Sequence, residues 1–255
     1  MNPYCFISCV GKSKVPDEDQ WKNNISGGMN RLYYVIDGIG GYYRQGKKIQ
    51  FKKNHLYLLP SYNDFPTWSS YENEESRLNH CFVNFEMIPP IITKEVIEYN
   101  PHNDPMAEIA FSMFDKIAES TECRMYNLKD DEIYYLKATV IYIVNKMMTA
   151  ARVETLDDKI VISALEKMHK NISEDISIKE LADQSFMSYY GFIRRFKNAL
   201  GMTPYTYLKQ LRIRTANALR NEGATLEEAA EKCGYSDSST LAHAISNEKR
   251  LPIIK

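Results

Sequence analysis

The spacing of hydrophobic residues divides the chain into a first part with strand periodicity and a later part with helical periodicity. Between residues 30 and 88, short runs alternate hydrophobic and polar positions, and glycine, proline and asparagine separate them. The runs cover 31–37, 42–44, 48–51, 55–59 and 78–86. Strands at this spacing predict a small antiparallel β-barrel or sandwich.

Helical periodicity begins at Pro105. One amphipathic helix is marked by Met106, Ile109, Ala110, Met113, Phe114 and Ile117, and a second by the broad apolar face of 131–151. So much apolar surface must be buried either against the strands or against a second subunit, and we favour self-association. The polar segment 152–158 is the predicted linker, and a further helix is expected at 159–170.

The next stretch predicts a helix, a tight turn and a second helix. Ser177 and Glu180 have the spacing of a capping box, and Ser188 is placed to cap the second helix. That second helix has an apolar side of Phe192, Phe196 and Leu200. Its other side carries Tyr189, Tyr190, Arg194 and Lys197.

The same pattern recurs downstream. A helix beginning with Thr203-Pro204 runs to Arg220, and it is followed by a capping box at Thr225 and Glu228. Gly234 stands where a turn is needed, and Ser236 or Asp237 caps a helix over 238–247. The chain is therefore predicted to be α+β, with strands first and an all-helical end that contains two helix-turn-helix units.

Charge separates the first of these units from the rest of the chain. The formal net charge is −1, yet no acidic residue occurs from Gln184 to Asn221. Such segregation predicts a polyanionic partner, the alternative being an ordinary solvated face. The basic residues of this stretch are Arg194, Arg195, Lys197, Lys209, Arg212, Arg214 and Arg220.

Composition predicts a soluble, unexported protein. No apolar run approaches the roughly 18 residues that span a bilayer, and the N-terminus lacks the pattern of a signal peptide. The five cysteines form no C-x-x-C pair, so neither a disulfide framework nor a zinc site is expected, and reduced thiols in the cytosol fit best. Cys5 and Cys9 are interpreted as ordinary packing residues.

One strand predicts a ligand pocket. His80, Phe82 and Asn84 fall on one face of 78–86, and the opposite apolar face should pack against a covering layer. A ring, an imidazole and an amide together are typical of a lining for small polar ligands, although an interior histidine beside a core phenylalanine is an equal alternative. Tyr33 and Asp37 complete the candidate ligand-binding set.

We expect no catalysis, no metal and no cofactor in the strand domain. Its histidines are His55, His80 and His102, and none forms the H-x-H pair of a metal-dependent barrel. No nucleophile elbow, P-loop or dinucleotide fingerprint occurs either.

The segment from Ile178 to about Pro252 resembles the DNA-binding domain of the AraC/XylS family of bacterial transcription regulators. The motifs that match are ELA at 180–182, S-x-x-x-x-x-R-x-F-K at 188–197, GMTP at 201–204, Y-L-x-x-L-R at 207–212, A-x-x-L at 216–219 and A-x-x-C-G-Y-S-D-S-S at 230–239. The first half is similar to the cupin-like sensor barrel of many members. The resemblance divides the chain into a sensor domain (1–104), a helical dimerisation segment (105–151), the linker (152–158) and the DNA-binding domain (159–255).

The resemblance implies a ligand-responsive regulator that places the second helix of each unit in the major groove of double-stranded DNA. It also implies a homodimer, a small-molecule effector such as a sugar or related metabolite, contact with RNA polymerase, no membrane, and a cytoplasmic location at the nucleoid. Arg194 is the candidate for a bidentate contact to guanine. The implied DNA-binding residues are Tyr189, Tyr190, Ile193, Arg194 and Lys197 in the first unit and Ser238, Ser239, Thr240, Ala242 and His243 in the second.

The second unit departs from the family pattern. His243 and Ser246 replace the usual basic residues, Leu241 and Ile245 replace phenylalanines, and nearby glutamates make the approach acidic. We therefore expect the first unit to supply most of the affinity and salt dependence. Two alternatives stay open: a regulatory partner subunit that binds DNA poorly, and a cupin-type enzyme fused to a DNA-binding tail.

Overall fold

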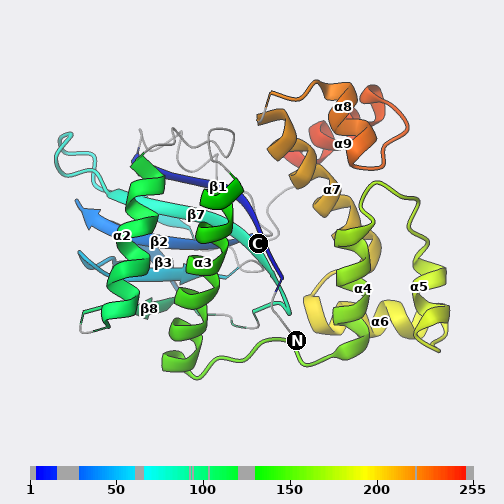
Figure 1. Ribbon diagram of the computed structural model, residues 1–255, viewed down its shortest axis with the longest axis horizontal. Coiled ribbons are helices and arrows are strands. Elements are labelled where there is room, and N and C mark those ends of the chain that lie inside the picture. The colour runs from blue at the N-terminus through cyan, green and yellow to red at the C-terminus, as the bar shows by residue number, and fades with distance from the viewer. Residues whose placement is uncertain are drawn as a thin grey trace. The chain divides into compact units, whose positions relative to one another are not determined.

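The computed structural model describes residues 4–15, 29–60, 66–91, 93, 95–102, 104–119, 130–221 and 223–250. It divides into two compact units, Met1–Leu156 and Asp157–Lys255. Over the described residues, the first holds antiparallel sheets and helices, and the second is helical (Figure 1). The predicted α+β class is confirmed, with strands first and helices last.

The first unit is built on two antiparallel sheets. The larger has the order β1 (Tyr4–Lys14), β7 (Asn79–Ile88), β2 (Asn30–Asp37), β5 (Leu56–Leu59) and β8 (Ile97–Tyr99). The smaller has the order β4 (Lys47–Gln50), β3 (Gly40–Arg44) and β6 (Thr67–Ser69). The predicted runs correspond to β2, β3, β4, β5 and β7, whereas the sequence pattern does not predict β1, β6 or β8.

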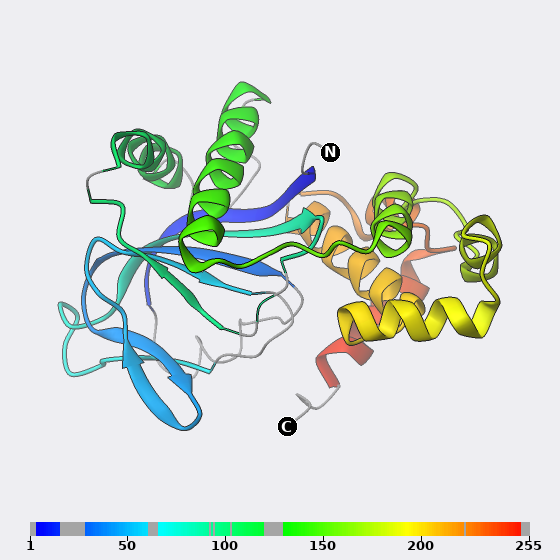
Figure 2. The ribbon, with the colours of Figure 1, turned by 90° about the horizontal axis from the view of Figure 1, so that it is seen from below.

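The two faces of the large sheet have different coverings. On β7, Cys81, Val83 and Phe85 point to one side and join the core beneath α2 (Pro105–Glu119) and α3 (Asp130–Ala151). Both helices lie on this one side of the sheet (Figures 1 and 2). The covering layer expected over this face is therefore helical. The opposite face forms an aromatic core that includes Tyr33 from β2, Tyr57 from β5, and Tyr42 from the smaller sheet.

Helix α2 buries a different stripe from the predicted one. Met106 and Ile109 are each 56% exposed, while Ala107, Phe111 and Phe114 are buried against the sheet and α3. The prediction was wrong for Met106 and Ile109 because α2 carries apolar residues on two sides. On α3 the predicted face is buried, with Leu136, Val140, Ile143, Val144 and Met147 each at most 1% exposed. The side chains of Ala110, Met113 and Ile117 lie outside the described residues.

Asp104 holds α2, α3 and β8 together. Its carboxylate caps α2 by accepting from the Ala107 amide at 3.1 Å, and it also accepts from the Tyr99 hydroxyl at 2.9 Å. Lys146 of α3 lies 3.2 Å away. The hydroxyl of Tyr99, the Ala107 amide and Lys146 lower the pKa of Asp104 to about 2. The carboxylate is thus ionised at neutral pH and fixes the helical layer on the sheet.

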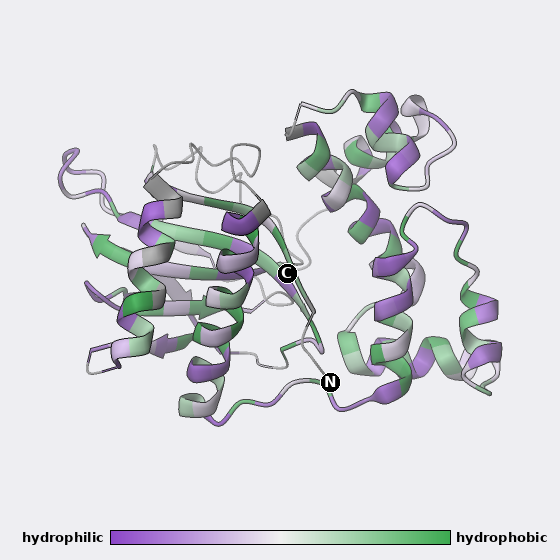
Figure 3. Cartoon of the chain, in the orientation of Figure 1, coloured by the Kyte–Doolittle hydropathy of each residue, from purple (hydrophilic) through white to green (hydrophobic). Residues whose placement is uncertain are grey.

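The described residues of the second unit form six helices, and side-chain caps set several of their ends. They are α4 (Lys159–Lys170), α5 (Ile178–Gln184), α6 (Tyr189–Leu200), α7 (Pro204–Asn221), α8 (Leu226–Lys232) and α9 (Ser238–Arg250). Asp158 caps α4, Ser177 caps α5, and Thr225 forms a reciprocal capping box with Glu228. Hydrophobic and hydrophilic residues alternate in bands along these helices (Figure 3), so each has a side for the core and a side for solvent.

The predicted linker 152–158 contains the division between the units. On the N-terminal side of this division, Thr155 forms a β-bridge with Ile91, and the Leu156 amide donates to the Pro90 carbonyl at 2.8 Å, both within the first unit. After it, Asp158 accepts from the Ile160 and Val161 amides at the start of α4. Most of this segment is therefore tied by backbone hydrogen bonds to one unit or the other.

Candidate nucleic-acid interface

The two helix-turn-helix units, α5–α6 and α8–α9, share the same turn. In the first, the Phe186 amide donates to the Asp183 carbonyl and the Met187 amide to the Ala182 carbonyl. In the second, the Gly234 amide donates to the Glu231 carbonyl at 3.2 Å, and the next amide bonds back in the same way. The sequence repeat is thus a repeat in backbone hydrogen bonding, and each turn leads into an exposed second helix.

The predicted residues of the first unit all lie on α6. Ser188 caps this helix by accepting from the Gly191 amide at 3.2 Å, and the buried Phe192, Phe196 and Leu200 fix which side faces the core. The opposite side therefore faces solvent. Tyr190 is 82% exposed and Tyr189 43%, with their rings 5.3 Å apart. Arg194 and Lys197 are exposed and Ile193 is half-buried.

Several basic residues of the acid-free stretch have structural partners. The Nε atom of Arg195 donates to the Asp158 carboxylate at 2.7 Å. Burial alone would raise the pKa of Asp158. The Arg195 guanidinium and the two amides capped by Asp158 have the larger effect together, so the pKa of this carboxyl is lowered. Arg220 donates to the Ala224 carbonyl, and Arg212 donates to carbonyls within the unit. The outward positive charge of α6 is therefore carried by Arg194 and Lys197.

The second unit presents a different surface. Asp237 caps α9 by accepting from the Thr240 amide at 2.7 Å, and it also accepts from the Thr240 hydroxyl at 2.9 Å. These bonds lower the pKa of Asp237, so a negative charge stands at the start of the helix. Ser239 and His243 are exposed, Ser238 and Ala242 are half-buried, and Leu241 is buried. This helix offers hydroxyl groups and an imidazole where the first offers a guanidinium and an ammonium.

Four of the five predicted ligand-binding residues lie together on the inner face of the large sheet. Tyr33 pairs with Phe82 across β2 and β7, its ring lies 4.6 Å from that of His80, and Asn84 follows on the same face. Tyr33 and His80 are buried, whereas Phe82 and Asn84 are half-buried. Burial lowers the pKa of His80 to about 4, so the ring is neutral at pH 7. Asp37 is exposed at the far end of β2.

Sequence reasoning missed two buried charged residues on that inner face. Arg31 pairs directly with Asn84, and Glu86 lies two residues further along β7. Their exposed fractions are 8% and 4%. The two-residue period of the strands places both beside the predicted set, so the signal was present in the sequence.

Two features were sought among the described residues, a cluster of metal ligands and a membrane-spanning helix, and neither was found. Among these residues, no three histidine, cysteine, aspartate or glutamate side chains are grouped as metal ligands. No described helix is both long and apolar enough to cross a membrane. Cys5 and Cys9 lie on β1, and burial raises the pKa of Cys5 to about 12.

Comparison with known proteins supports this reading of the helical unit. A family model described as a helix-turn-helix domain matches residues 181–252. An AraC-like transcription regulator of Streptomyces lividans is 33% identical over 98 residues, which are 38% of this chain and 32% of the relative. The transcriptional activator RhaS of Shigella boydii is 34% identical over 80 residues, covering 30% and 29%. The chain thus spans about a third of the length of these relatives.

Solved structures extend the likeness in fold to the whole chain. ToxT from Vibrio cholerae aligns with a TM-score of 0.54 and 10% identity over 99% of this chain and 95% of its own. A second ToxT structure, bound to (E)-4-(8-methylnaphthalen-1-yl)but-3-enoic acid, aligns with a TM-score of 0.57 and 11% identity over 96% and 92%. At these identities the likeness concerns the fold alone.

The repeated turns, the capped exposed helices and the family match together define a helix-turn-helix DNA-binding domain. Residues 181–252 match the helix-turn-helix family model, and about a third of the chain is similar to AraC-like transcription regulators.

Proposed function

We propose that the chain is a ligand-responsive transcription regulator that binds specific sequences of double-stranded DNA through its two helix-turn-helix units. The observation that carries this is the outward side of α6, where Tyr190, Arg194 and Lys197 are exposed in a stretch without acidic residues. The helix-turn-helix family model covers this helix, and the relatives that match about a third of the chain are described as transcription regulators. Such a protein acts in the cytoplasm, at the nucleoid.

The first unit is the dominant one. Arg194 has the fork of donors that reads the O6 and N7 atoms of guanine, and the tyrosines beside it suit apolar and hydrogen-bonding contacts in the major groove. Lys197, one turn further along α6, is the candidate for a phosphate contact. In the second unit, Asp237 holds the Thr240 hydroxyl and adds negative charge, which leaves Ser239 and His243 as the readers.

The effector site is the inner face of the large sheet. Tyr33, His80 and Phe82 supply rings, while Arg31 and Asn84 supply polar groups at one end of the same face. The rings favour a small ligand with an apolar body over the sugar implied by the family resemblance, and its polar group would lie at the end of the face where Arg31, Asn84 and Glu86 meet. Two ToxT structures contain acids with an apolar body, one of them an unsaturated fatty acid.

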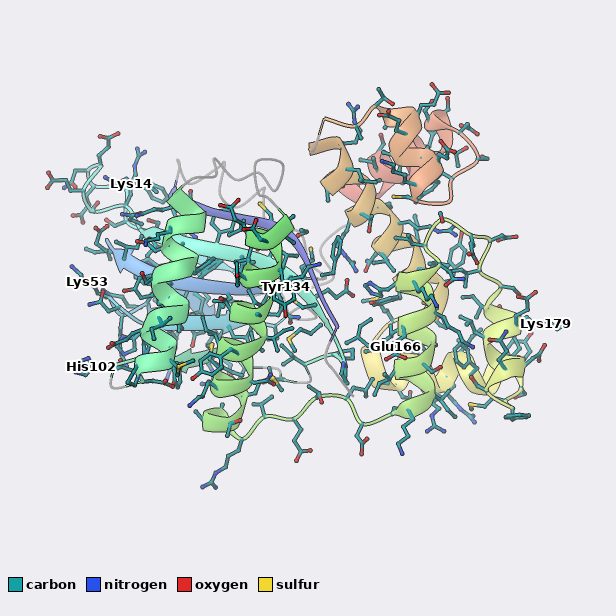
Figure 4. All side chains as sticks on the ribbon, in the orientation of Figure 1. Lys14, Lys53, His102, Tyr134, Glu166 and Lys179 are labelled. Atoms are coloured by element: carbon teal, nitrogen blue, oxygen red, sulfur yellow. The ribbon has the colours of Figure 1, made fainter. Side chains whose placement is uncertain are left out.

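The regulator works as a homodimer, and an exposed part of α2 is the proposed contact. Met106 and Ile109 lie one turn apart and are each 56% exposed, so they place two apolar side chains next to each other on the surface of α2. Sedimentation of the full chain tests this: Ile109→Lys is expected to give a monomer. Tyr134→Lys, on the exposed side of α3 (Figure 4), should leave the dimer intact.

Selection from a random DNA pool tests the function as a whole. The full chain should enrich a defined sequence, and its affinity should fall steeply as salt rises. Adding an unsaturated fatty acid should change the affinity, whereas a monosaccharide should not. Enrichment of no sequence by wild-type protein would refute the proposal, and a response to the sugar alone would move the effector class back to carbohydrates.

A second candidate function follows from the altered second unit. A chain whose α9 carries no arginine or lysine among its exposed reading positions can serve as a partner subunit that binds DNA only beside another regulator. The selection separates the two functions, because such a subunit enriches no sequence alone. Contact with RNA polymerase belongs to either function and is tested by transcription in vitro from the selected site.

A further inference from the structure

Arg212 joins the two helix-turn-helix units to the helix that runs between them. It lies in the middle of α7, and its guanidinium donates to the backbone carbonyl oxygens of Ile172 (3.2 Å), Glu174 (2.5 Å) and Gly234 (3.2 Å). Ile172 and Glu174 lie in the loop that leads into the first unit, and Gly234 lies in the turn of the second. One side chain therefore binds both units at once.

The second turn is shaped to admit the guanidinium. A Cβ atom at position 234 would lie 2.8 Å from Nη2 of Arg212 and 2.9 Å from the Ile172 carbonyl oxygen, so only glycine leaves room. The adjacent thiol of Cys233 shows the same proximity: burial raises its pKa to about 11, while the charge of Arg212 acts in the opposite direction. The guanidinium is thus directed into the unit, not outward toward phosphate.

The geometry points to Arg212 as a positioning residue that fixes the distance and angle between α6 and α9. It thereby sets the spacing between the two DNA segments that the protein reads, and this part of the inference rests on the proposed function. The residue type matters because arginine presents five donors in a rigid plane, whereas lysine is a single point charge on a flexible stem. Lysine cannot bond three carbonyl oxygens held in these directions.

The spacing requirement is tested on the selected DNA site. Full-length protein is titrated against versions of the site in which one base pair is inserted or removed between the two contacted segments. Wild-type protein should lose about tenfold in affinity for each change, because one base pair rotates one segment relative to the other. Arg212→Ala and Arg212→Lys should bind all spacings to within roughly threefold of one another. Lys170→Ala, which removes the same charge from an exposed position of α4, should keep the wild-type preference.

A second measurement needs no DNA. Pulsed electron paramagnetic resonance measures the distance between two nitroxide labels, one on α6 and one on α9. The labels are attached by non-cysteine chemistry at Asn198 and Asn247, which are both exposed. Wild-type protein should give a narrow distribution and both Arg212 variants a broad one. Gly234→Ala, which displaces the guanidinium from the other side, should broaden it as well.

The two measurements separate a failure of this inference from a failure of the proposed function. Unchanged distance widths together with an unchanged spacing preference in the Arg212 variants would overturn the inference. If wild-type protein bound no DNA, the proposed function would fail, yet the label distances would still decide whether Arg212 fixes the two helices.

Discussion

Phe186 and Gly234 occupy the same position in the two helix-turn-helix turns. Both have left-handed backbone conformations, with φ of +53° at Phe186 and +72° at Gly234, and both amides bond to the carbonyl three residues earlier. The phenylalanine ring is 98% exposed. The first unit therefore holds a bulky side chain where the second has glycine, in a conformation that costs a non-glycine residue about 1–2 kcal/mol.

Replacing Phe186 by glycine should stabilise the helical unit of residues 157–255. Phe186→Gly removes the left-handed strain but adds chain entropy to the unfolded state, and we expect a net gain of about 0.5–1 kcal/mol. Phe186→Ala removes the ring and keeps the strain, so it should give no such gain. Urea unfolding of the three proteins checks this, and equal stability of the glycine and alanine variants would argue against strain at this turn.

Gly234→Ala should be more damaging than Gly201→Ala. Both glycines have left-handed φ, +72° and +75°, but a Cβ at Gly201 meets nothing within 4 Å. Gly201→Ala should therefore cost only the conformational penalty, about 1 kcal/mol. Gly234→Ala must in addition move Arg212 or the Ile172 carbonyl. Unfolding midpoints measured side by side give the comparison, and equal losses would show that the close approach of Arg212 does not matter for stability.

The stability of the sheet-containing unit, Met1–Leu156, should fall as pH drops from about 6.5 to 4. Burial lowers the pKa of His80 from its ordinary value of 6.5 to about 4 in the folded chain. Between pH 4 and 6.5 the unfolded chain binds more protons than the folded chain, so the free energy of unfolding rises with pH. The full contribution of His80 is present above about pH 6.5. The loss on acidification is on the order of 3 kcal/mol.

The substitution His80→Asn separates this effect from that of carboxylates. Asn cannot titrate, so the variant should lose most of the pH dependence between 6.5 and 4. Asp104, whose pKa is about 2, acts at lower pH in both proteins. Urea unfolding at pH 7, 6, 5 and 4 is the measurement. Parallel pH curves for the variant and wild type would exclude His80 as the cause.

Sequence patterns predicted the elements whose two faces differ sharply in polarity. One face of β7, with Cys81, Val83 and Phe85, is uniformly apolar, and α6 separates Phe192 and Phe196 from Arg194 and Lys197, so both were predicted with their faces. Strand β1 was missed because cysteine, serine and glycine interrupt its apolar positions Ile7 and Val10. On α2 the prediction was right for Phe114, which is buried, and wrong for Met106 and Ile109, because apolar residues occur on two sides of this helix.

The candidate sites were predictable to different degrees. The turn at Phe186 carries no glycine, so its left-handed backbone has no sequence signal, whereas Gly234 has one. Arg31 and Glu86 were missed because a buried charge on a strand face resembles a solvated one until the neighbouring strands are in place. Arg212 appeared as one more basic residue, and only its distances to three carbonyl oxygens show its structural role.

The neighbouring residues Arg194 and Arg195 provide the most direct test of the central claim, that α6 of the first unit reads DNA sequence. They carry the same charge and lie on the same helix. Arg194 is exposed to solvent, whereas the Nε atom of Arg195 lies 2.7 Å from the Asp158 carboxylate. Titration of the selected DNA site with Arg194→Gln should show at least a tenfold loss of affinity and loss of preference for guanine at one position. Arg195→Gln should bind within about threefold of wild type, because its guanidinium serves an exposed ion pair. Equal losses in the two variants, or no loss in Arg194→Gln, would contradict the account.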